Sequence, residues 1–336
     1  MARPKPQRSN QPDPQRRPTP VGRSGNPAKA AAAAQAGPAQ AGRTRLTAGD
    51  WIAGARLRTL PLAIAPVALG TGAGVVAIAV GPWHPTRFAL ALIVALALQI
   101  GVNYANDYSD GIRGTDDHRV GPARLTASGL VNPKAVLYVA LAFFAVAALA
   151  GLALTIITQQ WWLLAVGAAA IVAAWFYTGG KRPYGYSGLG EVFVFVFFGL
   201  VATAGSAFVQ ALMVNLEAWI GGVGVGLLAC AVLMANNLRD VVQDRTAGKR
   251  TLAVLVGPVV GRILYTVFML VPFLIVGVLA LFYPTAVLVF FALLLALPAC
   301  VIVLTARTPR ELILALQLTS FTALVYGVGL GLAIAL

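Results

Sequence analysis

The sequence is poor in charge, cysteine and histidine, and each shortage excludes a class of protein. Only 11% of the 336 residues are charged, 59% are hydrophobic and the mean hydropathy is +0.80. This balance excludes an ordinary soluble domain and predicts a polytopic membrane protein. Cys230 and Cys300 stand alone inside apolar segments, which predicts buried thiols rather than a disulfide or a metal site. The two histidines, His84 and His118, are far apart in the sequence and give no support to a histidine metal site or proton relay.

The first 46 residues lack an apolar run long enough for the core of a signal peptide. They are rich in Pro, Gln, Arg, Gly and Ala, a composition that cannot bury enough apolar surface to fold. Residues 1–46 are therefore predicted to be a disordered, basic cytoplasmic tail, and residues 47–336 to form one membrane domain. For this tail a solvated extension is favoured over a tether to anionic lipid headgroups.

Long apolar segments fill the rest of the chain. A spanning helix needs about 20 mostly apolar residues, and backbone polar groups in lipid must be satisfied within the segment, which favours helices. The sequence predicts an all-α bundle of nine transmembrane helices, at 59–80, 86–106, 134–157, 160–178, 190–212, 217–237, 258–281, 283–305 and 310–335.

The basic residues predict the orientation of these helices. The formal net charge is +14, and nine of the 25 Lys and Arg residues lie within the first 50 residues. With the N-terminus in the cytoplasm and the C-terminus outside, every later Lys and Arg except Arg87 falls at the cytoplasmic side. Because cytoplasmic loops of membrane proteins carry such an excess, membrane topology explains this charge better than a nucleic-acid partner does.

An acidic cluster follows the second predicted helix, in the sequence NYANDYSDGIRGTDD from Asn103 to Asp117. Asp107 and Asp110 share a helix face with Asn103, and Asn106 adds a further amide. Mg²⁺ prefers oxygen ligands and is typically held by one or two carboxylates plus substrate phosphates. Gly111 and Gly114 are predicted to break the helix, so that Asp116 can return toward the ion from a loop.

A second cluster ends the sixth predicted helix, in the sequence NNLRDVVQDRTAGKR from Asn236 to Arg250. Asp240 and Asp244 lie one turn apart, with Arg239, Lys249 and Arg250 close by. Phosphate oxygens that are not bound to metal need Lys or Arg donors. Two such clusters at matching helix ends predict a cytoplasm-facing site for Mg²⁺ and a diphosphate, because carboxylates beside a membrane seldom lack a function.

The loop YTGGKRPYGYSGLGE between the fourth and fifth predicted helices offers further cationic and phenolic groups. With both clusters and this loop, the chain resembles the UbiA-type superfamily of intramembrane aromatic prenyltransferases from about Arg56 to its C-terminus. The wording NDYSDGIRGTD, RLRTLP and RDVVQDRTAGKRTLA resembles in particular the branch that prenylates 1,4-dihydroxy-2-naphthoate in menaquinone biosynthesis.

This resemblance implies transfer of a long polyprenyl group from polyprenyl diphosphate to 1,4-dihydroxy-2-naphthoate, with loss of CO₂ and diphosphate, to give demethylmenaquinone. It implies catalytic roles for Asp107, Asp110, Asp240 and Asp244, which with Asp116 would hold Mg²⁺. Three residues, Arg58, Tyr177 and Lys181, are candidates for orienting the acceptor. The candidates for binding the diphosphate are Asn103, Asn106, Arg113, Asn236, Arg239, Lys249 and Arg250.

Two other classes of membrane protein fit the sequence less well. A secondary transporter should place its charges near the midplane of the bilayer rather than at one face. A CDP-alcohol phosphotransferase needs the pattern DGxxAR, which the run Asp110–Arg113 begins but does not continue. Within the superfamily, 4-hydroxybenzoate or homogentisate as acceptor stays open, as do the prenyl length and the choice between Mg²⁺ and Mn²⁺.

Overall fold

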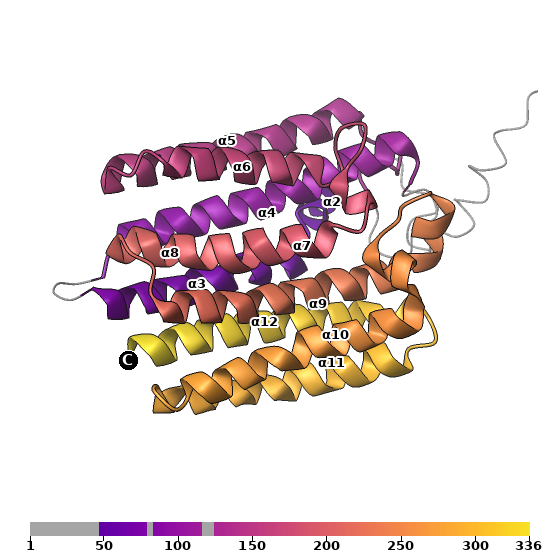
Figure 1. Ribbon diagram of the computed structural model, residues 1–336. Coiled ribbons are helices and arrows are strands. Elements are labelled where there is room, and N and C mark those ends of the chain that lie inside the picture. Colours follow the sequence, from indigo (N-terminus) through magenta and orange to yellow (C-terminus); the bar gives the residue numbers. More distant parts are fainter. Residues whose placement is uncertain (1–46, 79–82, 116–123) are drawn as a thin grey trace, which may run out of the picture. The chain divides into compact units, whose positions relative to one another are not determined.

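The computed structural model describes residues 47–78, 83–115 and 124–336. The predicted tail, residues 1–46, and the predicted ligand Asp116 lie outside these ranges. All regular elements within the described ranges are helical, as Figure 1 shows, so the predicted all-helical class is confirmed. The elements are α2 (Ala48–Gly54), η1 (Leu57–Thr59), α3 (Pro61–Ala77), α4 (Pro85–Arg113), α5 (Pro133–Thr158), α6 (Leu163–Phe176), η2 (Tyr184–Tyr186), α7 (Gly190–Val194), η3 (Phe195–Val201), α8 (Ala202–Ala211), α9 (Leu216–Thr246), α10 (Leu252–Leu279), η4 (Pro284–Ala292), α11 (Leu293–Thr305) and α12 (Glu311–Ala335).

Each of the nine predicted segments overlaps a helix. Seven helices of the described chain are long and apolar enough to cross a membrane. An eighth candidate is a bent pair, Ala48–Thr59 and Pro61–Ala77, whose halves meet at 46°. The remaining predicted segment is α6, which is apolar but only 14 residues long. The helices establish a multi-pass membrane protein, while nine crossings and the orientation stay predictions.

Local sequence explains where the helices begin and end. Proline occupies the first turn of α3, α4 and α5, a position where its missing N–H costs no hydrogen bond. The Asn132 side chain caps α5 by accepting the backbone N–H of Lys134 at 3.0 Å. Gly114 ends α4 with a φ of 72°, the left-handed conformation that glycine adopts at helix ends.

The helix that carries the first acidic cluster is longer than predicted. It continues through Gly111 to Arg113, so the predicted break at Gly111 is wrong, and only Gly114 ends the helix. Packing explains the glycine at 111, because a Cβ there would lie 2.4 Å from the Thr126 side chain. Asp107 and Asp110 therefore both project from regular helix.

The second cluster also lies on helix beyond the predicted end. Whereas the sixth segment was predicted to end at residue 237, α9 continues to Thr246 and carries Asp240 and Asp244. The following helix, α10, starts at Leu252 rather than at 258. It is interrupted at Gly257, whose φ of 81° is non-helical.

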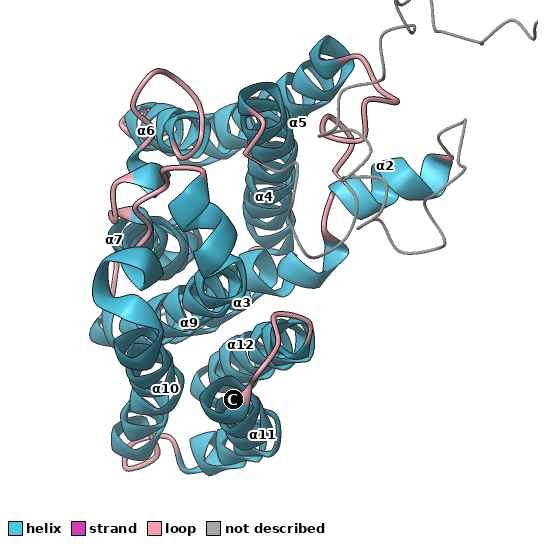
Figure 2. Ribbon diagram, turned by 90° about the vertical axis from the view of Figure 1, so that its right-hand side faces the viewer, coloured by secondary structure: helices cyan, strands magenta, loops and turns pink. Residues whose placement is uncertain are grey.

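The helices run side by side, and α9 is the most buried of the candidate spans. It packs against α10, α12 and α3, its neighbours in the view along the helices in Figure 2, and also against η3. Small residues allow close approach: a Cβ on Gly72 of α3 would lie 2.0 Å from the Gly331 carbonyl oxygen of α12. Cys230 and Cys300 are free and buried, which confirms their prediction as core thiols.

Candidate active site

One cavity of about 570 Å³ links both acidic clusters to the apolar interior. Its lining follows a single face of α4 from Ala91 to Asp110. The 19 steps along the helix from Ala91 to Asp110 correspond to roughly 28 Å at a rise of 1.5 Å per residue. Charged residues line one end of the cavity, and the other end is lined by apolar residues of α3, α4, α6 and α8. The cavity is therefore a channel with a charged mouth and an apolar body.

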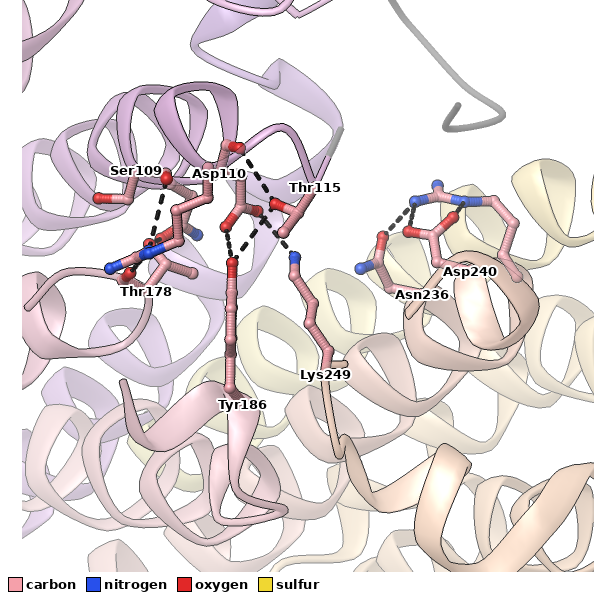
Figure 3. Close-up of polar contacts among 11 residues, drawn as sticks. Ser109, Asp110, Thr115, Thr178, Tyr186, Asn236, Asp240 and Lys249 are labelled. Carbon is pink, nitrogen blue, oxygen red and sulfur yellow. Dashed lines mark hydrogen bonds and ion pairs between the residues drawn. The ribbon is translucent and has the colours of Figure 1, made fainter. Parts of the chain in front are cut away.

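Asp110 is the centre of the first cluster. The residue is 4% exposed. Its carboxylate accepts the Tyr186 hydroxyl at 2.6 Å on Oδ1 and the Lys249 Nζ at 3.1 Å on Oδ2. Figure 3 shows Lys249 reaching from the chain after α9 to this carboxylate on α4. The ion pair thus joins the two sequence clusters, as their predicted convergence requires.

Tyr186 connects Asp110 to both neighbouring cations. Its ring lies 4.6 Å from Lys249 Nζ and 5.6 Å from the Arg113 guanidinium carbon, within the range of cation–π contact. Burial, and then the negative charge of Asp110, raise the pKa of the Tyr186 phenol. The phenol therefore stays protonated and donates its hydrogen bond to Asp110.

Asp107 has a different environment from Asp110. Its Oδ1 accepts the Thr126 N–H at 2.8 Å and its Oδ2 accepts the Leu125 N–H at 3.0 Å. The residue is 1% exposed, although it is part of the cavity lining. Both oxygens thus fix the turn at residues 125–129. Arg124, which directly precedes this turn, lines the cavity.

The second cluster is built around a buried ion pair. Arg239 donates from Nε to Asp240 Oδ1 at 2.7 Å and from Nη2 to Asp240 Oδ2 at 2.6 Å. Nη2 also donates to Asn236 Oδ1 at 2.8 Å. Asp244, one turn further along α9, lines the same cavity. The pairing fixes the guanidinium plane and leaves Arg239 Nη1 buried without a hydrogen-bond partner within the described chain.

The two predicted asparagines of α4 hold neighbouring segments at the cavity. Asn103 Nδ2 donates to the Ala55 carbonyl at 2.9 Å and to Thr59 Oγ1 at 3.1 Å. Asn106 Oδ1 accepts the Thr178 hydroxyl at 2.6 Å. Both residues also line the cavity, so they link its wall to the bend before α3 and to the loop after α6.

The cavity gathers most of the predicted site residues but not all of them. Those that line it are Arg58, Asn103, Asn106, Asp107, Asp110, Tyr177, Asn236, Arg239, Asp240, Asp244 and Lys249. Arg113 instead donates to the carbonyl oxygens of Thr178 and Gly180 and so holds the loop after α6. Lys181 and Arg250 are exposed and outside the lining.

Several cavity residues were missing from the predicted set. Arg56 and Arg124 line the cavity. From the sequence alone, both were predicted only to set the orientation of the helices in the membrane. Gln243 and Thr251 also line it, and their Oε1 and Oγ1 atoms are buried without hydrogen-bond partners in the described ranges. Gln243 stands four residues after Arg239 on the cavity-facing side of α9, which was the available sequence signal.

The charged mouth has a donor set that fits a metal-bound diphosphate. Within the described residues, no group of three or more His, Cys, Asp or Glu side chains is close enough to hold a metal by itself. Mg²⁺ commonly takes one or two protein carboxylates and completes its shell with substrate phosphates and water. Asp110, Asp240 and Asp244 could supply such carboxylates, and the unpaired Nη1 of Arg239 can donate to a phosphate oxygen.

A membrane-embedded helical bundle that joins a charged mouth to a long apolar channel has the architecture of an enzyme whose substrate combines an anionic head with a lipid tail. The UbiA prenyltransferase family matches residues 64–311, and the chain belongs to this family of prenyltransferases.

Curated relatives carry a more specific name. The chain is 50% identical over 289 residues to the 1,4-dihydroxy-2-naphthoate octaprenyltransferase of Mycobacterium tuberculosis. The matched residues cover 85% of this chain and 97% of that relative. The chain is 39% identical over 218 residues to the enzyme of the same name from Escherichia coli, covering 63% of this chain and 70% of the relative.

Solved structures share the fold. The apo structure of a UbiA homolog from Aeropyrum pernix K1 matches with a TM-score of 0.61 at 15% identity, over 80% of this chain and 96% of that chain. A UbiA homolog from Archaeoglobus fulgidus, bound to DMAPP and Mg²⁺, matches with a TM-score of 0.56 at 15% identity, over 85% and 99%. At these identities the likeness establishes the helical architecture.

Proposed function

We propose that this prenyltransferase moves a long polyprenyl group from polyprenyl diphosphate to 1,4-dihydroxy-2-naphthoate, with loss of CO₂ and diphosphate, to give the quinol form of demethylmenaquinone. The observation that carries the proposal is the 50% identity to a relative of that name over 97% of the relative's length. The cavity supports it, because its charged mouth suits a diphosphate and its apolar body suits a polyprenyl tail.

The diphosphate would lie at the mouth between α4 and α9. Asp110, Asp240 and Asp244 would hold Mg²⁺, and Asp107 and Asp116 remain predicted members of that set. When bound, the metal would neutralise the charge that develops on the departing diphosphate. Lys249 and Arg239 would donate to phosphate oxygens, with Asn236 holding the Arg239 guanidinium in place.

Loss of diphosphate leaves an allylic cation next to the acceptor ring. The apolar wall excludes water, so the electron-rich ring rather than a water molecule attacks the cation. Arg58 and Tyr177 line the cavity, and we assign them to the acceptor: Arg58 to its carboxylate and Tyr177 to its ring or hydroxyl groups. Lys181 and Arg250 are exposed, so their predicted contacts would require the loops to close on the substrate.

We place the protein in the cell membrane with the charged mouth facing the cytoplasm. The support is the distribution of Lys and Arg, which leaves Arg87 as the one basic residue on the outer side of the proposed topology. The proposed organisation is a basic cytoplasmic tail, residues 1–46, followed by the membrane domain, residues 47–336.

An acceptor panel tests the proposed reaction. Purified protein in liposomes, with Mg²⁺ and a polyprenyl diphosphate, is offered 1,4-dihydroxy-2-naphthoate, 4-hydroxybenzoate or homogentisate, and product mass and CO₂ release are measured. We expect prenylated naphthoquinol and CO₂ from the naphthoate alone. Prenylation of only the benzoate or of homogentisate would contradict the proposed acceptor but keep the family chemistry.

Lys249→Met separates the two ends of the site. Methionine keeps the side-chain length beside the Tyr186 ring but removes the charge that faces Asp110. A lost hydrogen bond to a charged group predicts a rise of roughly ten- to a hundredfold in KM for the prenyl diphosphate, with little change in KM for the acceptor. Steady-state kinetics with each substrate varied in turn measure both values, and the reverse pattern would show that Lys249 serves the acceptor.

A further inference from the structure

The apolar body of the cavity ends before the outer side of the membrane domain. Its deepest lining includes Ala91 of α4 and Val209 of α8. Just beyond them, Arg87 Nη1 donates to the Val209 carbonyl at 2.9 Å, and the buried Gln210 side chain exchanges hydrogen bonds with the His84 backbone at 2.9 and 3.2 Å. These bonds tie the start of α4 to the end of α8. A long tail therefore cannot run straight through the protein.

The side of the cavity between α5 and α6 is different. Five residues of its lining there, Ala148, Leu152, Leu164, Gly167 and Ala168, are exposed on the surface of the bundle, where lipid would surround a membrane protein. Beside an enclosed stretch along α3, α4 and α8, the cavity thus has a lateral opening toward lipid.

Gly205 of α8 stands in the wall of the enclosed stretch. The cavity-facing residues of this span recur as Ala202, Gly205, Ser206 and Val209, which share one helix face. Gly205 lies twelve residues beyond Phe193 along this span and is therefore deeper in the membrane domain. Phe193 stacks on Tyr184 at 3.9 Å between ring centroids and belongs to the charged end.

Packing does not explain the glycine at this position. A Cβ on Gly205 would meet no heavy atom within 4 Å. In the same span, a Cβ on Gly199 would lie 2.6 Å from Gly226 Cα, so that glycine is required by the contact with α9. Since glycine is unfavourable inside a helix relative to larger residues, the open space at Gly205 calls for another reason, and the cavity supplies it.

We propose that Gly205 is a specificity-determining residue for the length of the prenyl donor: it keeps the enclosed stretch wide enough for tails that reach past its depth. The inference rests on the proposed use of prenyl diphosphates as donors, and it is independent of the acceptor. A larger side chain at position 205 would fill this stretch. It would not affect the binding of short tails, which end between the charged mouth and residue 205.

Donor binding without an acceptor tests the inference directly. Wild type and Gly205→Leu are titrated in detergent with Mg²⁺ and either dimethylallyl, geranyl, farnesyl or octaprenyl diphosphate, and the rise in unfolding temperature gives the affinities. We expect Gly205→Leu to weaken octaprenyl diphosphate binding by roughly ten- to a hundredfold, since the displaced tail loses buried apolar contact. Dimethylallyl diphosphate binding should match wild type.

Two controls separate blockage from damage. Gly205→Ala adds a single methyl group. Its ratio of octaprenyl to dimethylallyl diphosphate affinity should equal that of wild type or lie between those of wild type and Gly205→Leu. Gly277→Leu also adds a side chain to a glycine within a span, in α10 and outside the cavity lining, where the nearest atom to a Cβ is Phe290 Cζ at 4.0 Å. It should leave all affinities unchanged.

If the ratio of octaprenyl to dimethylallyl diphosphate affinity is the same in wild type and in Gly205→Leu, the inference is overturned. If Gly205→Leu does not fold, the same ratio is measured in Gly205→Val, and an unchanged ratio in that variant is equally decisive. Failure of wild type to bind any prenyl diphosphate would instead overturn the proposed donor, whereas binding of donors without turnover of the naphthoate would overturn only the proposed acceptor.

Discussion

Asp240→Asn is expected to lower kcat/KM by on the order of a thousandfold or more while the protein stays folded. The carboxylate accepts two hydrogen bonds from Arg239, and both groups are almost fully buried. Asparagine offers only one acceptor oxygen and no charge, so the variant loses a proposed metal ligand and also frees the guanidinium plane that would face the diphosphate. Turnover with saturating and limiting polyprenyl diphosphate measures the loss.

Glu217→Gln is the matched control for Asp240→Asn. Glu217 lies on the same helix, α9, but at its opposite end, where it accepts the Tyr283 hydroxyl at 3.0 Å. Wild-type turnover in this control would show that loss of an α9 carboxylate is not harmful in general. Retained turnover in a folded Asp240→Asn variant would remove Asp240 from the proposed site.

Substitutions of Asp107 and Asp110 are expected to fail in different ways. Asp110 faces Lys249 and Tyr186 in the cavity, so Asp110→Asn should reduce turnover about as strongly as Asp240→Asn. In Asp107→Asn, an amide NH₂ group replaces one of the two acceptors of the Leu125 and Thr126 N–H groups. The unsatisfied buried donors predict a loss of roughly 1–3 kcal/mol of folding free energy.

The Mg²⁺ dependence of turnover, measured beside thermal unfolding, distinguishes the two aspartates. We expect a lower unfolding temperature for Asp107→Asn and an altered Mg²⁺ dependence for Asp110→Asn. If Asp107→Asn unfolds at the wild-type temperature and shifts the Mg²⁺ dependence as Asp110→Asn does, Asp107 acts on the metal directly, as the sequence alone predicted.

Helical periodicity accounts for what could be predicted of this site. The i, i+4 spacing of Asp240 and Asp244 correctly indicated one face of one helix, and α9 carries both. The charged mouth followed from two such faces at the same end of the bundle. Lys249 pairs with Asp110, 139 positions away. The sequence predicted that the two clusters lie close together, but not this particular ion pair.

Contacts between distant segments account for what could not be predicted. Nothing in the spacing of the first cluster reveals that the Asp107 oxygens are taken by a turn 18 and 19 residues later. Arg113 likewise follows Asp110 by three residues and shares its helix face, but its guanidinium binds carbonyl oxygens of the loop after α6. Gly111 was predicted to break the helix, but it is a glycine because it packs closely against Thr126. Thr126 belongs to another segment, so the local sequence does not reveal this contact.

The most direct test of the metal–diphosphate site is the binding of an unreactive thiolodiphosphate analogue of the donor, by calorimetry, to wild type and to the Asp240→Asn variant. We predict tight binding to wild type in Mg²⁺, at least tenfold weaker binding in EDTA, and no metal dependence in Asp240→Asn. Equal affinity with Mg²⁺ and with EDTA in wild type would contradict the assignment of the charged mouth to a metal-bound diphosphate.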